Sequence, residues 1–359
     1  MWKSLFLAIA ALLIGGTASA WKIEGRITGV ADKDSVKVRI FRIWHNSGIS
    51  FDADTIRNGR FSFSGTLPAG ERAKMTISSS TGRYTGSLWM TDTTRMQITG
   101  TADGSWKAAS NEPEQAIEVE MRDVDLSDLE ALIGSAEGYE KYRDSVWRLS
   151  VERLWPVYLR YPNSRAMLDN LNFYVHVGAV PKEKLQWVYD RLTPENRATL
   201  HGQAIALAID PPHQPQVGER FVDFEGADTA GVACKLSDYA GRGKYVLLDL
   251  WSAGCGGCYA AFPEMKKLYA EYGDRLEIVG ITLDVSKEMW IGAIQWQQLP
   301  WKHISDGMGT YAGAGVLYGT NVMPTYVLID PQGTIVERWY PGQGDFQDRM
   351  VEPYLKKKE

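Results

Sequence analysis

The stretch KYVLLDLW, from Lys244 to Trp251, restricts the fold of this chain more than any other feature. It is a nearly continuous apolar run, which is typical of a strand buried on both faces of a sheet. A second such run, RLEIVGITLD, ends at Asp284, and a helical pattern follows each run. Buried strands that alternate with helices predict an α/β domain in this part of the chain.

The end of this domain has a different pattern. The segment MPTYVLIDPQGTIVERW predicts a hairpin that turns between Asp330 and Gly333. Before it, the expected helices are YAAFPEMKKLYAEYG, which ends at Gly273, and EMWIGAIQWQQL. We therefore predict a mixed sheet flanked by helices.

Cys255 and Cys258 form a CGGC motif between the first buried strand and the helix that follows it. We expect Cys255 to cap this helix, where unpaired N–H groups and the helix dipole favour the reactive thiolate. Cys258 follows one helical turn later on nearly the same face, close enough to form a disulfide. The spacing therefore predicts a redox pair in which Cys255 attacks and Cys258 resolves a mixed disulfide.

Two other interpretations of the CGGC pair are weaker. A structural zinc site needs four ligands, and the sequence contains neither a second CxxC nor a suitably spaced pair of histidines. A purely structural disulfide that closes so short a loop would constrain the unfolded chain little. With only 3 cysteines in 359 residues, the chain does not rely on crosslinks as small exported domains do.

Residues 1–20, MWKSLFLAIAALLIGGTASA, have the pattern of a signal peptide. Lys3 supplies the positive start, Leu5 to Ile14 an apolar stretch too short to span a bilayer, and Ala18 to Ala20 a small-residue cleavage site. An N-terminal membrane anchor is the alternative. We expect a mature chain that begins near Trp21, has no membrane span and works outside the cytoplasm.

Residues 21–108 read as short strands. Their side chains alternate in character with period two, and Asn58-Gly59 is a hairpin-turn dipeptide. We predict an all-β, sandwich-like domain here. His45 is expected on a loop, and without a second ligand nearby it does not indicate a metal site.

Residues 109–210 are predicted to be helical, because apolar residues recur at helical spacing from Ser127 onwards and Ser127 and Glu130 match a capping box. The Pro-rich residues 211–217 predict a linker to the α/β domain at 218–359. Because the net charge is −5 and the basic clusters are short, we do not expect nucleic acid as a partner.

Three motifs carry a family resemblance: LSDYAGRGKYVLLDLWSAGCGGC, LEIVGITLD and MPTYVLID, in this order. Gly218 to about Tyr354 resembles the exported TlpA/ResA-like thiol–disulfide oxidoreductases of the thioredoxin superfamily, in the AhpC/TSA-related group. The upstream β-domain and helical segment resemble the extensions of such proteins in Bacteroidetes. The resemblance implies a thioredoxin fold, the periplasm or cell envelope of a Gram-negative bacterium, and chemistry that needs no metal or organic cofactor.

The resemblance also implies roles for single residues. Asp249 matches the buried acid that helps the resolving cysteine lose its proton, and burial in an apolar strand would raise its pKa accordingly. A core aspartate without a catalytic part is the alternative. Trp251 matches the tryptophan beside the disulfide, Pro324 matches the cis-proline that faces it, and the backbone of Met323 is expected to pair with an extended substrate polypeptide.

The chain departs from the family pattern around the cysteines. Gly254 stands where thioredoxins often have an aromatic residue, and Gly256-Gly257 where Gly-Pro is common. Two glycines leave the loop less preorganised. Many relatives carry a glutamate at the position of Ala261. The redox potential and the direction of electron transfer therefore do not follow from the resemblance.

For two remaining side chains we expect no part in the chemistry. Cys234 is expected to be a buried, inert thiol, with a regulatory thiol as the alternative. His303 is expected to have a structural role, since it lies in a helix–strand connection.

The sequence thus predicts an oxidoreductase that exchanges disulfides with protein thiols and with an upstream thiol donor or acceptor. Residues 21–210 are expected to provide a protein interface. One alternative is a thiol peroxidase, although peroxiredoxins usually use a Pro-x-x-x-Thr-x-x-Cys setting rather than CGGC. The other is a binding or assembly module on a thioredoxin scaffold, since a fold does not determine a function.

Overall fold

The computed structural model describes residues 20–30, 37–44, 47–67, 72–81, 83–84, 86–310, 312–320, 322–340 and 351–356. His45 and residues 1–19 of the predicted signal peptide lie outside the described residues. The chain divides into two compact units, Met1–Ile43 with Ile49–Ala116, and Trp44–Gly48 with Ile117–Glu359. The finer division at residues 108, 210 and 217 stays a prediction.

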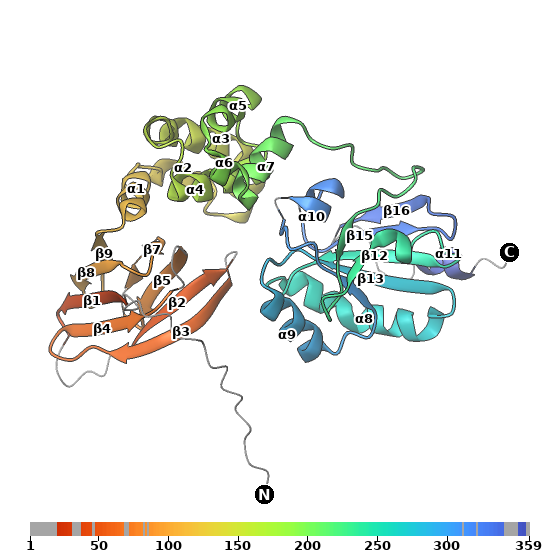
Figure 1. The fold of residues 1–359 in the computed structure, drawn as a ribbon, viewed down its shortest axis with the longest axis horizontal. Helices are drawn as coiled ribbons and strands as arrows, with labels where there is room; N and C mark the ends of the chain where they lie inside the picture. Colours follow the sequence, from red (N-terminus) through yellow and green to blue (C-terminus); the bar gives the residue numbers. More distant parts are fainter. Residues whose placement is uncertain are drawn as a thin grey trace, which may run out of the picture. The chain divides into compact units, whose positions relative to one another are not determined.

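In its described residues, the first unit contains nine β-strands in one hydrogen-bonded sheet of order β3-β2-β5-β6-β9-β8-β1-β4, with β7 paired to β5 (Figure 1). Inward-facing side chains such as Trp21, Met75 and Trp106 form its core. The strands are β1 (Trp21–Thr28), β2 (Lys37–Trp44), β3 (Ser47–Thr55), β4 (Arg60–Gly65), β5 (Ala73–Ser79), β6 (Arg83–Tyr84), β7 (Leu88–Met90), β8 (Arg95–Thr101) and β9 (Ser105–Ser110).

Period-two patterning explains these strands. Buried and exposed residues alternate along β1 and along the first half of β8, as expected for strands with one face on a core. The predicted turn at Asn58-Gly59 is confirmed, since both residues have positive φ angles, 51° and 68°. Gly25 is required by packing, because a Cβ atom there would lie 2.0 Å from Cε1 of Phe61.

Helices make up the described chain from Pro113 to Ile209. They are α1 (Pro113–Arg122), α2 (Ser127–Leu132), α3 (Ala136–Arg160), α4 (Arg165–His176), α5 (Lys182–Arg191), α6 (Pro194–Arg197) and α7 (Leu200–Ile209).

The helical pattern from Ser127 is interrupted, because α2 ends at Leu132 and Ser135 caps α3 by accepting a hydrogen bond from the Gly138 N–H at 3.0 Å. The predicted capping box is therefore wrong: the Ser127 hydroxyl donates to Asp125 instead.

The C-terminal part of the second unit is built on a five-stranded sheet of order β14-β13-β12-β15-β16 (Figure 1). β12 is parallel to β13 and antiparallel to β15, which confirms the predicted mixed sheet with its terminal hairpin. Its elements are β10 (Glu225–Ala227), β11 (Ala233–Lys235), a 3-10 turn (Leu236–Asp238), β12 (Tyr245–Trp251), α8 (Gly256–Tyr272), β13 (Leu276–Thr282), α9 (Lys287–Gln297), β14 (Lys302–Ile304), α10 (Gly313–Leu317), β15 (Thr325–Ile329), β16 (Ile335–Trp339) and α11 (Glu352–Lys356).

Both faces of this sheet are covered. Along β12, Leu247 and Trp251 belong to a core cluster shared with α8, α9 and α11, whereas Leu248 and Leu250 belong to a second cluster on the other face. A strand buried on both faces is what the run KYVLLDLW predicted. In the part of the chain that the structure describes, none of the helices is long and apolar enough to cross a membrane.

Candidate active site

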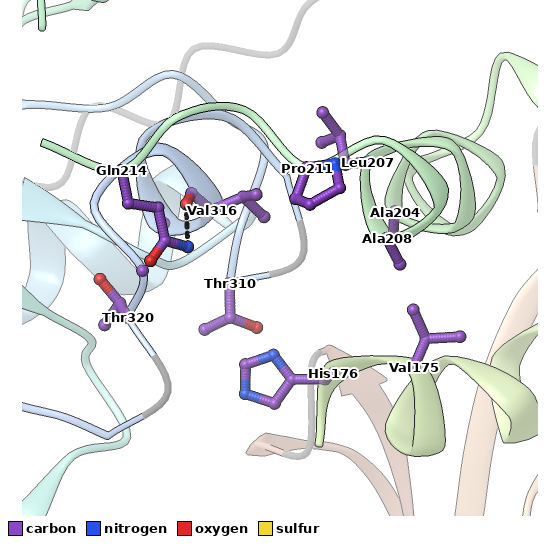
Figure 2. Close-up of a pocket in the computed structure, with 12 residues that line it drawn as sticks. Val175, His176, Ala204, Leu207, Ala208, Pro211, Gln214, Thr310, Val316 and Thr320 are labelled. Atoms are coloured by element: carbon purple, nitrogen blue, oxygen red, sulfur yellow. Dashed lines mark hydrogen bonds between the residues drawn. The ribbon is translucent and has the colours of Figure 1, made fainter. Parts of the chain in front are cut away.

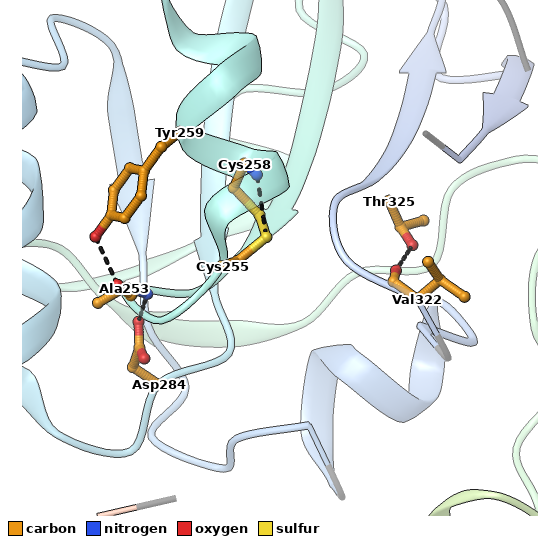
Figure 3. The surroundings of a disulfide bond; sticks show 7 residues. All are labelled: Ala253, Cys255, Cys258, Tyr259, Asp284, Val322 and Thr325. Carbon is orange, nitrogen blue, oxygen red and sulfur yellow. Dashed lines mark hydrogen bonds between the residues drawn. A yellow bond between two sulfur atoms is a disulfide. The ribbon is translucent and has the colours of Figure 1, made fainter. Parts of the chain in front are cut away.

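The fold brings the two cysteines of CGGC together at the start of α8. The chain leaves the sheet at Trp251, and Cys255 is the N-cap of the helix, as predicted. Its Sγ atom accepts a hydrogen bond from the Cys258 N–H at 3.1 Å (Figure 3). An N–H group of the first helical turn thus points at the Cys255 sulfur, where it would stabilise a thiolate.

Cys255 and Cys258 are joined by a disulfide, with their Cα atoms 5.3 Å apart (Figure 3). Their environments differ. Cys258 is fully buried in the core cluster of α8, whereas Cys255 is only partly buried and packs at the margin of that cluster. A partner molecule can therefore reach the first sulfur more easily than the second.

Two side chains clamp the loop before Cys255. The Ala253 N–H donates to Oδ2 of Asp284 at 2.8 Å, and the Tyr259 hydroxyl donates to the Ala253 carbonyl at 2.5 Å (Figure 3). The Thr282 hydroxyl donates to the same Asp284 oxygen at 2.8 Å and so orients the carboxylate. Both polar groups of the Ala253 backbone are therefore satisfied by side chains from other elements.

This clamp compensates for a loop that has little stiffness of its own. Apart from adjacent residues and the backbone of the same helix, no described atom lies within 4 Å of the position that a Cβ would occupy at Gly254 or Gly256. Tyr259 and Asp284 were not among the site residues predicted from the sequence. The signal that could have found Asp284 is its place as an acidic residue directly after a buried strand, at the same edge of the sheet as the cysteines.

Asp249 lies inside the domain, on the same face of the sheet as its neighbours Leu247 and Trp251. The residue is 0% exposed, and neither carboxyl oxygen has a hydrogen-bond partner among the described residues. Burial raises its pKa to about 8, because the charged form loses its hydration. The carboxyl is therefore largely protonated at neutral pH and can exchange a proton in the physiological range.

The structure also places the predicted substrate-side residues beside the CGGC loop. The Met323–Pro324 bond is cis, as the resemblance implied. A Cβ atom at Gly257 would lie 3.5 Å from Cδ of Pro324 and 4.0 Å from the Met323 carbonyl oxygen. The turn is held by the Thr325 hydroxyl, which donates to the Val322 carbonyl at 2.5 Å (Figure 3).

Aromatic rings surround the site. Trp251 is fully buried and meets Phe262 of α8 edge to face, with 5.3 Å between ring centroids. On the solvent side, Tyr259 meets Trp296 of α9 at 5.5 Å. Trp296 is 73% exposed, so an accessible indole lies next to the clamped loop. This tryptophan was not among the site residues predicted from the sequence.

Cys234, by contrast, is not part of this site. It lies in β11, is partly buried against the second core cluster, and forms no disulfide. Burial raises its pKa, which lowers the thiolate fraction. Among the described residues, no group of three His, Cys, Asp or Glu side chains is placed to hold a metal ion.

A separate pocket of about 140 Å³ lies in the second unit (Figure 2). It is lined by residues such as Val175 and Ala204 of the helices and Thr310 and Val316 near α10, and the Gln214 amide donates to the Val316 carbonyl at 3.1 Å. Its lining contains no thiol, no carboxylate and none of the predicted site residues. It therefore offers no redox chemistry.

Comparison with known proteins agrees with this geometry. The AhpC/TSA family model matches residues 217–338. Thiol-disulfide oxidoreductase ResA of Bacillus anthracis is 29% identical over 143 residues, which are 40% of this chain and 78% of the relative. ResA of Oceanobacillus iheyensis is 34% identical over 129 residues, which are 34% of this chain and 64% of that relative.

A solved structure is also similar. The thioredoxin domain of a thiol-disulfide oxidoreductase from Bacteroides vulgatus is 29% identical, and the likeness covers 39% of this chain and 98% of that chain with a TM-score of 0.35. The family match lies wholly in the C-terminal part of the chain, where the CGGC disulfide, Asp249 and the cis-proline are found. In this part, the chain is similar to the TlpA/ResA-like thiol–disulfide oxidoreductases of the thioredoxin superfamily.

Proposed function

We propose that this protein exchanges disulfides with protein substrates, with Cys255 as the attacking and Cys258 as the resolving cysteine. The observation that carries the proposal is the CGGC disulfide at the N-terminus of α8, with one accessible and one buried sulfur. The helix dipole and the Cys258 N–H favour a thiolate on Cys255.

The reaction has two exchange steps. In the reduced protein, the Cys255 thiolate attacks a substrate disulfide, one substrate sulfur leaves as a thiolate, and a mixed disulfide forms. Cys258 then loses its proton and attacks Sγ of Cys255, which releases the second substrate thiolate and forms the Cys255–Cys258 disulfide. The reverse sequence oxidises a dithiol substrate.

Asp249 is proposed as the group that exchanges the Cys258 proton. Its burial on the Trp251 face of the sheet and its raised pKa support this role. Asp249→Asn is expected to slow resolution by Cys258 without abolishing attack by Cys255. Equal rates of mixed-disulfide resolution in the variant and the parent would contradict this role.

The substrate polypeptide is proposed to lie across the cis-proline turn. The backbone of Met323 would pair with an extended segment of the substrate, Pro324 would shape this contact, and Trp251 would pack beside the disulfide. The Met323 carbonyl and Pro324 face the loop at Gly257, which supports this arrangement.

We also propose roles for the rest of the chain. Residues 1–20 are a signal peptide, and the mature protein acts in the periplasm or cell envelope. Residues 21–108 are a sandwich-like domain, and together with the helical residues 109–210 they provide a protein interface. Residues 211–217 link this part to the redox domain.

Trapping and titration test the function together. Cys258→Ser should accumulate mixed disulfides with partner proteins, whereas Cys255→Ser should accumulate none. In graded glutathione or dithiothreitol buffers, the parent pair should titrate as one two-electron couple. A potential of about −270 mV would indicate a reductase, and one of about −120 mV would indicate an oxidant. If the pair does not titrate in this way, the remaining hypothesis is a binding or assembly module on a thioredoxin scaffold.

The AhpC/TSA match makes a thiol peroxidase the second candidate. It would consume peroxide without a protein thiol partner. Oxidation of the reduced Cys255–Cys258 pair by peroxide at a rate comparable to its oxidation by a protein disulfide would favour the peroxidase, and much slower oxidation by peroxide would favour the exchange function.

A further inference from the structure

Trp296, near the end of α9, holds an exposed indole beside the CGGC loop. The residue is 73% exposed, and its ring meets the ring of Tyr259 with 5.5 Å between centroids. Tyr259 follows Cys255 by one helical turn, and its hydroxyl donates to the Ala253 carbonyl (Figure 3). The tyrosine that clamps the loop therefore also holds the indole on one side, while most of the indole surface faces solvent.

Glycines leave space for another molecule around the accessible sulfur and the indole. Gly254 and Gly256 flank Cys255, and Gly292 lies one helical turn before Trp296 on α9. Apart from adjacent residues and the backbone of the same helix, no described atom lies within 4 Å of the position that a Cβ would occupy at these three glycines. Glycine allows another backbone to approach closely. A partner polypeptide can therefore come near both the sulfur and the indole.

The segments that adjoin the site carry no charged side chains. No Asp, Glu, Lys or Arg occurs in the segments that hold the CGGC loop, Trp296 and the cis-proline turn, although 23% of the residues in the whole chain are charged. These segments are residues 251–263, 289–301 and 319–329. Asp284 also reaches the loop, but its Oδ2 already accepts hydrogen bonds from Ala253 and Thr282. Interface centres are depleted in charged residues and enriched in tryptophan, so these surroundings favour an apolar partner segment over a charged one.

The exchange reaction restricts where a partner lies. In a mixed disulfide the two Cα atoms are about 4.4–6.8 Å apart, and an extended chain advances about 3.3 Å per residue. The residues next to the partner's cysteine therefore stand over the loop and its neighbours. Figure 3 shows Tyr259 and Val322 on opposite sides of the disulfide, and Val322 is 52% exposed. Exposed apolar side chains thus lie on both sides of the reacting sulfur.

We infer that Trp296 is a specificity-determining residue, whose indole binds an apolar side chain next to the reactive cysteine of a partner polypeptide. The inference rests on the proposed function and names its substrate class, which is extended segments in which an apolar residue adjoins the cysteine. It is carried by the exposed indole, by its contact with the clamp of the loop, and by the uncharged surroundings of the disulfide.

The test uses the full reduced chain and disulfide-linked homodimers of a short peptide with one cysteine. Both peptide sulfurs are equivalent, so attack by Cys255 on either one releases one peptide thiolate. Cys258 then attacks Sγ of Cys255 and releases the second peptide. One peptide disulfide is thus reduced to two thiols while the protein pair is oxidised. The peptides differ only in the residue before or after the cysteine, which is leucine, serine, glutamate or lysine, and alkylation of free thiols gives the rate constants.

The parent should react about tenfold faster with leucine than with serine at one of the two flanks, because partial burial of leucine against the indole stabilises the complex. Glutamate and lysine should give no gain over serine. Trp296→Ala should reduce the leucine–serine ratio to about one, and Trp296→Gln, which keeps a long side chain without a ring, should do the same. Trp296→Phe retains a ring against Tyr259 and should keep most of the ratio.

Two controls separate partner binding from damage to the loop. Bis(2-hydroxyethyl) disulfide has no flanking side chain, so Trp296→Ala should slow it far less than the leucine peptide. Val232→Ala removes apolar surface at a residue that is 61% exposed directly before β11. This variant should match the parent in its rate constants and in its leucine–serine ratio.

An unchanged leucine–serine ratio in Trp296→Ala, or an equal loss of rate with every disulfide, would overturn the inference. A parent that prefers glutamate or lysine would overturn it as well. If a second copy of this chain covers the indole instead, sedimentation will show self-association that Trp296→Ala abolishes, and the parent will not prefer leucine. Failure of the proposed function looks different, because the parent would then react with none of the disulfides, including the hydroxyethyl one.

Discussion

At the scale of single residues, the buried carboxyl of Asp249 explains both the proposed proton exchange and a loss of folding free energy. Asp249 is enclosed by the apolar side chains of its core cluster and has no hydrogen-bond partner among the described residues. An unpaired charge in such a place is unfavourable, so the group is retained at the expense of folding free energy. A residue of this kind is expected where function needs it.

Asp249→Asn should therefore stabilise the protein in a pH-dependent manner. The folded-state pKa of Asp249 is raised, so the unfolded chain loses this proton first, and the parent loses stability as pH rises from about 4 to about 8. The loss is about 1.4 kcal/mol per pH unit, or about 4 kcal/mol by pH 7. Urea unfolding of the oxidised proteins at several pH values measures it.

The exposed Asp274 provides the control, since Asp274→Asn should change stability little at any pH. A difference between Asp249→Asn and the parent that does not vary with pH would contradict the raised pKa.

Tyr259→Phe should loosen the loop before Cys255. The change leaves the Ala253 carbonyl without its side-chain donor, which should lower the free energy of unfolding by about 1 kcal/mol. Amide hydrogen exchange should also speed up at Cys255, whose N–H donates to the Ser252 carbonyl in this loop.

Tyr269→Phe is the matched control on the same helix, because its hydroxyl donates to Glu277 rather than to the loop. Faster exchange at Cys255 in both variants would mean that the effect comes from α8 as a whole and not from the clamp.

At the scale of elements, the α8 junction and the sheet beneath it use glycine for different reasons. In the first turn of α8, Gly257 has room for a side chain, with Pro324 at ordinary contact distance. In β13, Gly280 has none, because the rings of His303 and Trp251 occupy the space. The same substitution should thus have opposite effects at the two positions.

Gly257→Ala should stabilise the oxidised protein by about 0.5–1 kcal/mol, since alanine loses less conformational entropy in a helix. Gly280→Ala should destabilise it by about 1–3 kcal/mol, because the added methyl group overpacks the core. Thermal and urea unfolding measure both changes. If Gly280→Ala also raised the free energy of unfolding, the space above Gly280 would be able to adjust to the added methyl group.

At the scale of the whole molecule, the cores of the two ends of the chain are separate. Among the described residues, the core cluster of the first unit is formed by residues between Trp21 and Ala108, and the two clusters beside the five-stranded sheet are formed by residues from Phe221 onwards. Neither core needs side chains of the other for its burial.

A fragment that begins at Pro211 should therefore fold and keep the redox potential of the full chain. It retains Gln214, whose amide donates to the Val316 carbonyl, and Gly218, whose N–H donates to the Ile335 carbonyl at 2.8 Å. Glutathione titration of fragment and full chain tests this. A shifted potential would show that residues before 211 act on the redox site, and an unfolded fragment would refute the independence of its core.

The local features of this protein can be predicted from its residue patterns. Continuous apolar runs predicted β12 and β13, the Asp330–Gly333 turn predicted the hairpin of β15 and β16, and Cys255 was correctly expected at the cap of α8. These features depend on neighbours within a few positions, so patterns of burial and turn chemistry reveal them. The capping box at Ser127 failed because a nearby Asp125 competed for the same hydroxyl.

Which distant residues meet depends on long-range packing. Asp284 and Tyr259 reach Ala253 from separate elements, and Asp249, Gly280 and His303 fall into one row only through the register of three strands. Register is set by the packing of whole faces, and a shift of one residue would turn His303 to the other face. A single sequence carries the residue types of this site, while long-range packing decides their juxtaposition.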